Sequence, residues 1–367
     1  MKKDLLKSLK RDCVHFRGDI PCEPHRMKAV WCPECSDYTS REGIILILKL
    51  GAKGDVIRTT PLLAAFRKKF PKHEIWWMTK YPEVLPNGIV AKALPLTLES
   101  VLSVQAIDFD LLVNLDKEPE ALGLASMLRA KRTLGFLMRN GRAFPAGAET
   151  EHKWLTGIHN GYSKQNTLSY PEEIFEMCGF KFNGEEYLLP EPQPLPDEVQ
   201  RQLTGKNLVG LVTGTGSRWP TRNWPPEHCA EFCRLMRGRG FSVLLLGGAR
   251  EDGINRKLAA EHAAFYCGFF PFRQFISLVN VCDVVVTPVT MPLHVAVGLR
   301  KQVVLLNNIF NRNEFYLYGR GEIVEPSTGC ECYYAAGCRR SRACAWDIQP
   351  EAIYQACLRR LALVVSS

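Results

Sequence analysis

Three loops of this chain combine glycine, hydroxyl, carboxylate and cationic side chains that suit chemistry on a phosphorylated ligand. The first is Gly51-Ala52-Lys53-Gly54-Asp55, whose glycines permit a sharp turn and a close approach of the backbone to a ligand. It lacks both the Gly-Lys-Ser/Thr ending of an ATPase loop and the spacing of a dinucleotide fingerprint. Asp55 stands at the expected start of a helix. Its carboxylate therefore either caps that helix or accepts a proton from a bound hydroxyl.

The second loop, residues 213–225, contains Ser217 and Arg222 together with two tryptophans and several glycine and threonine residues. Backbone amides and a planar guanidinium, which can bind phosphate oxygens in bidentate fashion, suit a nucleotide diphosphate. The alternative is a surface loop that buried indole rings anchor.

The third loop, residues 287–294, leads from an expected strand into an expected helix, with Thr290 as the predicted cap and Pro292 in the first turn. A helix N-terminus offers unpaired amides and the positive end of the helix dipole, so it favours an anion. His294 follows on this helix. It is either a functional residue or a satisfied core histidine.

Cysteines are concentrated near the two ends of the sequence. Cys13, Cys22, Cys32 and Cys35 are spaced C-x8-C-x9-C-x2-C, with His15 and His25 interleaved, and Cys330, Cys332, Cys338 and Cys344 form a second dense group. Each group is interpreted as four thiolate ligands of a structural zinc or iron ion. Free thiols or a redox pair are the alternative. The other six, which lie in apolar surroundings, are predicted to be core residues: Cys178, Cys229, Cys233, Cys267, Cys282 and Cys357.

The elements that would position these loops follow an alternating strand and helix pattern, which predicts an α/β fold with parallel sheets. The 367 residues are enough for two domains. We expect strands at 43–50, 74–79, 110–115, 132–136, 207–212, 241–246, 283–287 and 302–306, and helices at 55–70, 118–129, 227–237, 252–262 and 350–361. The predicted organisation is a Cys-rich extension (1–42), an N-terminal domain (43–188), a Pro-rich linker (189–205), a C-terminal domain (206–346) and a final helix (347–367).

Charge and composition exclude several classes of protein. The profile of 46% hydrophobic and 23% charged residues is that of a folded chain and not of a disordered, collagenous or coiled-coil one. No apolar run reaches the length of a bilayer span, and charges interrupt the N-terminus too often for a secretory signal, so we expect a cytoplasmic protein. The net charge of +9, with basic clusters at 129–142 and 339–342, favours phosphate-bearing partners or an anionic membrane surface, or is a solvated face without a partner.

Taken in order, the three loops resemble glycosyltransferase family 9, the heptosyltransferases of lipopolysaccharide core assembly. The likeness covers about residues 43–362, and its landmarks are Gly54-Asp55-Val56-Ile57-Arg58-Thr59-Thr60-Pro61, Arg222-Asn223-Trp224-Pro225, Leu245-Leu246-Gly247-Gly248 and Thr290-Met291-Pro292-Leu293-His294. The resemblance implies a GT-B fold of two Rossmann-like domains that face a cleft, with the acceptor on the first domain and an ADP-sugar on the second.

This resemblance also implies an inverting displacement that needs no catalytic metal, with Asp55 as the base. The implied donor-binding set is Gly54, Ser217, Arg222, Glu251, Thr290, Met291 and His294. The family usually has Asp-Thr-Gly before its Pro-x-His, whereas this chain has Val289-Thr290-Met291, so the exact donor sugar is left open. The C-terminal cysteines are similar to those of metal-bearing members.

The leading hypothesis is therefore a transferase that moves heptose from ADP-heptose to a lipid-linked core glycan. We expect it to contact the inner face of the cytoplasmic membrane peripherally and to form a homo-oligomer, and we expect no nucleic-acid partner. One alternative is a related transferase that glycosylates a protein or another glycan. The other is an inactive metal-binding or nucleic-acid-binding module in which the altered donor loop marks lost activity.

Overall fold

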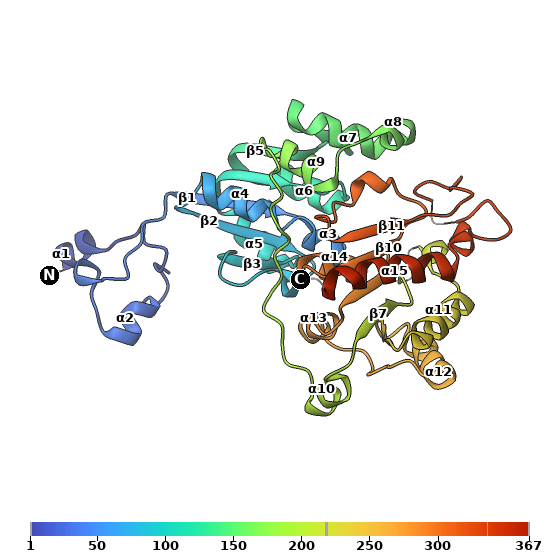
Figure 1. Cartoon of the computed structure of the whole chain (residues 1–367). Coiled ribbons are helices and arrows are strands. Elements are labelled where there is room, and N and C mark those ends of the chain that lie inside the picture. Colours follow the sequence, from blue (N-terminus) through green and yellow to red (C-terminus); the bar gives the residue numbers. More distant parts are fainter. Residues whose placement is uncertain (1, 217–218, 336, 366–367) are drawn as a thin grey trace. The chain divides into compact units, whose positions relative to one another are not determined.

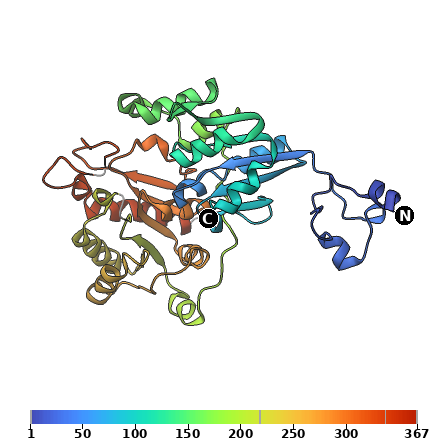
Figure 2. The same ribbon diagram turned by 180° about the vertical axis from the view of Figure 1, so that it is seen from behind.

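A computed structural model describes residues 2–216, 219–335 and 337–365 (Figure 1; seen from behind in Figure 2). The contacts of the chain divide it into two units. The first unit comprises Met1–Lys49, Leu63–Thr79 and Gly88–Ala146, and the second comprises Leu50–Leu62, Lys80–Asn87 and Gly147–Ser367. The loop that carries Asp55 thus has most of its contacts within the second unit, although the strand before it belongs to the first.

The first unit is built on a six-stranded sheet in the order β3-β2-β1-β4-β5-β6. Strands β1 to β5 pair in parallel, whereas β6 pairs antiparallel to β5. Its strands are β1 (Gly43–Leu48), β2 (His73–Thr79), β3 (Lys92–Pro95), β4 (Asp108–Asn114), β5 (Arg129–Arg139) and β6 (Arg142–Pro145), and its helices are α1 (Lys2–Ser8), α2 (Glu23–Lys28), α4 (Leu62–Lys69), α5 (Leu98–Gln105) and α6 (Pro119–Met127). A continuous run of isoleucine and leucine lets β1 lie buried in the middle of this sheet.

The second unit contains a five-stranded, fully parallel sheet in the order β11-β10-β9-β7-β8. Its strands are β7 (Leu208–Val212), β8 (Ser242–Leu246), β9 (Val284–Pro288), β10 (Gln302–Leu306) and β11 (Gly321–Val324), and its helices are α3 (Lys53–Ile57), α7 (Glu151–Ile158), α8 (Asn160–Gln165), α9 (Tyr170–Met177), α10 (Asp197–Leu203), α11 (Pro226–Gly238), α12 (Asp252–His262), α13 (Phe272–Asn280), α14 (Met291–Gly298) and α15 (Pro350–Val365). The predicted α/β fold with two parallel-sheet domains is confirmed.

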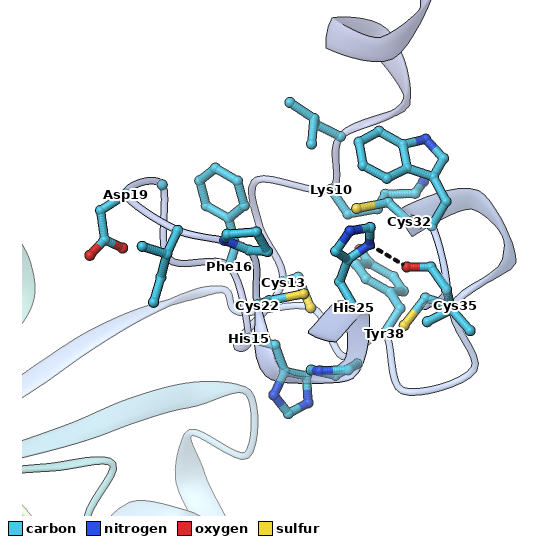
Figure 3. A pocket seen from close by; sticks show the side chains of 17 residues that line it. Lys10, Cys13, His15, Phe16, Asp19, Cys22, His25, Cys32, Cys35 and Tyr38 are labelled. Carbon is cyan, nitrogen blue, oxygen red and sulfur yellow. Dashed lines mark hydrogen bonds between the residues drawn. The ribbon is translucent and has the colours of Figure 1, made fainter. Parts of the chain in front are cut away.

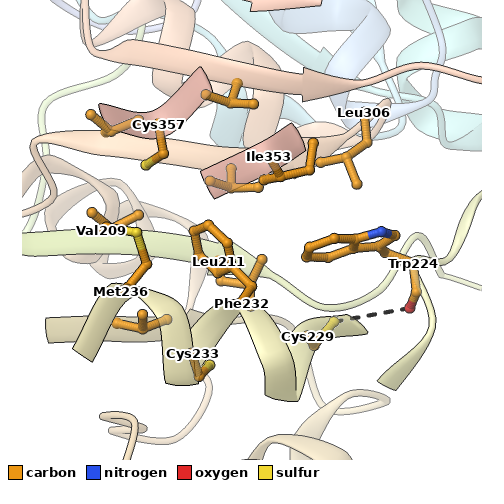
Figure 4. Close-up of a cluster of buried hydrophobic side chains, with 14 of the residues drawn as sticks. Val209, Leu211, Trp224, Cys229, Phe232, Cys233, Met236, Leu306, Ile353 and Cys357 are labelled. Atoms are coloured by element: carbon orange, nitrogen blue, oxygen red, sulfur yellow. Dashed lines mark hydrogen bonds between the residues drawn. The ribbon is translucent and has the colours of Figure 1, made fainter. Parts of the chain in front are cut away.

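The core of the second unit forms where α11 and α15 pack together beside the sheet (Figure 4). Phe232 and Met236 of α11 are fully buried there, with Cys229 and Cys233 on the same helix face. Burial raises the pKa of Cys233 to about 12, so its thiol stays protonated at neutral pH. The predicted core cysteines are buried as expected, except that Cys267 is only partly buried.

The prediction of one continuous helix over residues 55–70 is wrong, because this segment forms two helices. The structure ends α3 at Ile57 and begins α4 only at Leu62. Pro61 has no N–H to donate and its ring would clash with the carbonyl one turn earlier, so the helix cannot run through it. The hydroxyls of Thr59 and Thr60 instead donate to the carbonyls of Asp55 and Ile57, both at 2.7 Å.

The Pro-rich segment 189–196 is neither helix nor strand, while α10 occupies the later part of the predicted linker. This segment lies alongside α13 and is hydrogen-bonded to it. The N–H of Gln193 donates to the Arg273 carbonyl at 3.1 Å, and the Ser277 hydroxyl donates to the Gln193 carbonyl at 2.5 Å. Within the described ranges, no helix is both long and apolar enough to cross a membrane.

Candidate active site

The segment from Gly51 to Arg58 sets the position of the Asp55 carboxylate. Oδ2 of Asp55 accepts a hydrogen bond from the backbone N–H of Ala52 at 3.3 Å, which fixes the first turn of α3. Oδ1 forms an ion pair with Nη2 of Arg58 at 2.8 Å. Ala52 is thus the N-cap residue of α3, and Asp55, the third helical residue, binds its N–H while the Asp55 side chain stays 34% exposed. Each carboxylate oxygen has two lone pairs, so a carboxylate oxygen can accept more than one hydrogen bond.

Arg58 is held on several sides. Its guanidinium lies 3.6 Å from the centre of the Tyr170 ring, and Nη1 lies 3.6 Å from Oε2 of Glu314. Burial lowers the pKa of Arg58, but the carboxylates of Asp55 and Glu314 outweigh it and raise the pKa overall. Arg58 is therefore a permanent cation that orients Asp55.

Gly54 and His294 meet where α3 and α14 pack together. A Cβ at Gly54 would lie 2.6 Å from Cδ2 of His294 and 3.3 Å from Cα of Met291, so no larger residue fits without movement of α14. His294 is buried and lies against the Tyr187 ring, with the ring centres 6.0 Å apart. Burial, reinforced by Arg58, lowers the pKa of His294 to about 3. His294 is thus neutral in the folded chain and packs against Gly54 and Tyr187.

Arg222 comes from the loop between β7 and α11. Nη1 of Arg222 donates to the backbone carbonyl of Val289, and its guanidinium lies 5.7 Å from the Trp219 ring and 5.4 Å from the Phe310 ring. The loop itself is fixed by Thr215, whose hydroxyl is close to the Trp219 carbonyl (3.0 Å) and to Oδ1 of Asn223 (2.5 Å). Ser217 lies outside the described residues.

Thr290 is the N-cap residue of α14, as predicted. Its side chain makes no capping hydrogen bond, so the backbone conformation alone defines the cap. Met291 lies in the first helical turn and is not among the described residues with positive φ. Val289 contributes its backbone carbonyl, a role that a valine fills as well as any residue.

These groups line one cavity of about 390 Å³, which we call the Asp55 pocket; among its lining residues are Asp55, Arg58, Arg222, Thr290, Met291 and His294. A carboxylate, a cation and the N-terminus of α14 therefore border the same space. The sequence did not single out Lys53, Arg58, Tyr81 or Phe310 as site residues, although all four line this cavity. Arg58 could have been noticed from its position one turn after Asp55.

Glu251 lines a second cavity of about 330 Å³, the Glu251 pocket, which shares Lys53, Thr290 and Met291 with the first. Oε2 of Glu251 accepts the backbone N–H of Gly248 at 2.9 Å. A Cβ at Gly214 would lie 2.4 Å from Oε1 of Glu251, so the absence of a side chain at Gly214 leaves space for the Glu251 carboxylate. Phe272 and Phe275 add an apolar wall.

The C-terminal cysteines come together in pairs. Sγ of Cys332 lies 3.8 Å from Sγ of Cys338, and the thiol of Cys332 accepts the backbone N–H of Arg339 at 3.0 Å. Burial, together with the neighbouring Cys330, raises the pKa of Cys344 to about 11. All four thiols are free. In the described part of the chain, no three His, Cys, Asp or Glu side chains are close enough together to hold a metal ion.

One sheet that is parallel except for β6 and one fully parallel sheet, each with helices, match the GT-B fold. The chain aligns with the crystal structure of a family 9 glycosyltransferase from Veillonella parvula at a TM-score of 0.67 and 16% identity, over 90% of this chain and 99% of that one. For E. coli ADP-heptose lps heptosyltransferase II the TM-score is 0.63 at 17% identity, over 88% and 99%. For the dodecameric iron-containing heptosyltransferase TibC in complex with ADP-D-beta-D-heptose it is 0.55 at 10% identity, over 89% and 79%.

Sequence comparison also finds similarity to heptosyltransferases. Residues 185–320 match the model of glycosyltransferase family 9 (heptosyltransferase). Lipooligosaccharide heptosyltransferase 2 of Haemophilus ducreyi is 24% identical over 38% of this chain and 47% of its own length, and lipopolysaccharide heptosyltransferase 1 of Campylobacter coli is 24% identical over 52% and 60%. The chain thus spans about half the length of these relatives. The predicted resemblance to glycosyltransferase family 9 is confirmed.

Proposed function

We propose that this chain is an inverting glycosyltransferase that transfers heptose from ADP-heptose to a lipopolysaccharide core or a related glycan acceptor. The observation that carries the proposal is the Asp55 pocket, where a partly exposed carboxylate borders the same cavity as Arg222 and the N-terminus of α14. The relatives at family level are heptosyltransferases, which supports the class of reaction.

In the proposed reaction, Asp55 accepts the proton of an acceptor hydroxyl as the hydroxyl oxygen attacks the anomeric carbon of the donor sugar. The bond from that carbon to the diphosphate breaks as the new glycosidic bond forms, and ADP leaves with the bonding electrons. Attack opposite the leaving group inverts the anomeric centre. The carboxylate and the diphosphate must therefore lie on opposite sides of the sugar.

The leaving diphosphate gains negative charge, and the pocket supplies groups that stabilise it. Arg222 lines the cavity, as do Thr290 and Met291 at the N-terminus of α14, where the positive end of the helix dipole lies. The Glu251 pocket adjoins this region and shares Thr290 and Met291 with it, so we assign it to the nucleoside part of the donor. Its acidic side chain suits the hydroxyls of a ribose.

The setting of the reaction is proposed from the charge on the surface of β5. We place it in the cytoplasm with a lipid-linked acceptor at the inner membrane face, since exposed basic residues of β5 favour an anionic surface. Two of them are partly neutralised, because Arg129 pairs with Asp108 at 2.5 Å and Lys131 with Asp110 at 2.6 Å. A homo-oligomer is proposed as well, as the related TibC is dodecameric.

The test is transfer itself. The full chain is incubated with ADP-heptose and a panel of acceptors that includes core lipopolysaccharides, other glycans and a protein, and the product is analysed by mass spectrometry and by NMR of the anomeric proton. We expect a heptosylated glycan whose anomeric configuration is opposite to that of the donor. Retained configuration would exclude the proposed displacement, and transfer only to the protein would exclude the glycan acceptor. Failure to bind ADP in calorimetry would exclude the donor.

A further inference from the structure

The N-terminal segment before β1 contains a cavity of about 340 Å³ that the proposed transfer reaction does not use (Figure 3). Cys13, Cys22, Cys32 and Cys35 all line it, as do His15 and His25. We infer that this segment is a zinc module in which Cys22, His25, Cys32 and Cys35 bind one Zn²⁺ ion.

The first two ligands belong to one helical turn. Cys22 is the N-cap residue of α2, and the N–H of Arg26 donates to its carbonyl at 3.0 Å. His25 lies three residues after Cys22, a spacing that places two side chains on the same face of a helix. The thiol of the N-cap residue and the imidazole of His25 therefore stand three residues apart at the start of α2.

His25 is already oriented as a metal ligand would be. Its Nδ1 lies 2.7 Å from the backbone carbonyl oxygen of Val30, as the dashed line in Figure 3 marks. Because a carbonyl only accepts, Nδ1 carries a proton, and in the neutral ring Nε2 then carries the lone pair. Metal-binding histidines are commonly fixed in this way, with the second ring nitrogen bonded to a carbonyl. Nε2 of His25 has no hydrogen-bond partner among the described residues.

The other two ligands flank a tight turn. Cys32 opens the 3-10 helix η1 (Cys32–Glu34), and the N–H of Cys35 donates back to the Cys32 carbonyl at 3.4 Å. A turn of this kind lets both thiolates of a Cys-x-x-Cys pair reach one ion. A double hydrogen bond from Lys28 to the carboxylate of Asp37, at 2.8 and 2.6 Å, joins the end of α2 to the chain that follows this turn.

The segment also lacks the core that would otherwise hold it together. Among residues 2–42 only Pro24 is fully buried, and Leu5, Leu6, Phe16, Ile20 and Met27 are exposed. A stretch of about 40 residues rarely folds on apolar burial alone and usually needs a metal or disulfides. The thiols are free, so disulfides do not fill this role here.

The ligand set differs from the four cysteines expected from the sequence. Cys13 lies in an isolated antiparallel bridge to Ser40, and the residues three positions before and after it, Lys10 and Phe16, are not metal ligands. Cys22 pairs with His25, and Cys32 pairs with Cys35, with two residues between the members of each pair. Three thiolates and one imidazole form a tetrahedral set that suits zinc. Among the described residues, no three such side chains converge to metal-binding distance, so zinc binding must draw the two pairs together.

The experiment measures zinc in the full chain, expressed with added zinc, purified without an affinity tag and analysed by plasma mass spectrometry. Cys22→Ser, Cys32→Ser and His25→Gln should each hold about one equivalent of zinc less than the wild type. His25→Cys should restore it as a four-thiolate site. Cys13→Ser and His15→Gln are the matched controls, since both residues line the same cavity but are outside the ligand set. These controls should keep the wild-type content, and Cys332→Ser reports separately on any ion at the C-terminal cysteines.

Hydrogen exchange provides a second readout on the same proteins. Removal of zinc with a chelator should increase amide exchange over residues 9–40 and leave the strands of both sheets protected. Loss of zinc in Cys13→Ser with retention in His25→Gln would overturn the ligand set. Iron instead of zinc in both aerobically and anaerobically purified protein would contradict the assignment of zinc as the metal. Amide exchange over residues 9–40 that does not change on addition of the chelator would contradict a structural role of the metal.

Discussion

Asp55 and Arg58 form a 2.8 Å ion pair across one turn of chain, and the other edge of the same guanidinium faces Glu314 at 3.6 Å. The carboxylate that is proposed to accept the proton is therefore held by a cation that is itself held by a second carboxylate and the Tyr170 ring. This chain of contacts links the segment after β1 to the η5 turn (Arg312–Glu314) more than 250 residues later. Orientation of Asp55 thus depends on residues far apart in the sequence.

Arg58→Met should lower kcat more than it raises KM for the donor, because the guanidinium orients the base and is not itself assigned to the diphosphate. Loss of the cation also removes a stabiliser of the Asp55 carboxylate, so the acidic limb of the kcat/KM profile should move to higher pH. Arg58→Lys should restore the pH profile in part, since it restores the charge without the bidentate geometry. An unchanged pH profile in Arg58→Met would show that Arg58 only supports the fold.

Gly54→Ala should impair transfer strongly, because the new methyl group meets the His294 ring and the backbone of Met291. Overpacking of this kind costs about 1–3 kcal/mol of stability and displaces the start of α14. Gly253→Ala is the matched control, since a Cβ there meets nothing within 4 Å and the residue lies in α12. The control should be stabilised by about 0.5–1 kcal/mol in thermal unfolding and keep its activity. Equal activity of the two variants would contradict the close packing at Gly54.

Arg222→Ala should weaken ADP binding by about tenfold to a hundredfold, as expected for loss of hydrogen bonds between charged groups. The variant also loses the contact of Nη1 with the Val289 carbonyl, so thermal stability must be measured in parallel. Arg222→Lys should recover part of the affinity through its charge. Calorimetry with ADP gives the answer directly, and wild-type affinity in Arg222→Ala would remove this residue from the donor site.

Stability at low pH should depend on His294. Its pKa is lowered from 6.5 to about 3 in the folded chain, so below pH 6.5 the unfolded chain binds the proton more readily. Stability is therefore fully present above pH 6.5 and falls as the pH drops towards 3, by at most about 1.4 kcal/mol per pH unit from this residue. His294→Gln should have a flatter dependence of unfolding free energy on pH between 7 and 4. A curve as steep as that of the wild type would assign the acid sensitivity to other groups.

The local parts of the site followed from the sequence because short patterns determine them. The run of isoleucine and leucine before Gly51 predicted β1, and the glycines around Asp55 predicted the turn that displays it. Arg222 and Thr290 were found in the same way, as each stands in a loop directly after a strand. Periodicity and turn chemistry act over a few residues and can be read without coordinates.

The parts that were missed depend on distant contacts. Arg58 gains its role from Glu314 and Tyr170, neither of which any local pattern relates to it. Phe310 lies beside Arg222 only because the chain after β10 returns to the loop before α11. Thr290 was predicted as the cap of α14 and is its N-cap residue, but the sequence did not indicate that its hydroxyl makes no capping hydrogen bond.

The most direct test of the central claim compares ADP binding and sugar transfer in the same Asp55→Asn protein. Because asparagine has the shape of aspartate but cannot take the proton, transfer should fall by about a hundredfold to ten-thousandfold while ADP affinity stays close to that of the wild type. Asp197→Asn, a carboxylate change on the distant α10, should alter neither. Transfer at the wild-type rate by Asp55→Asn would contradict the assignment of Asp55 as the base.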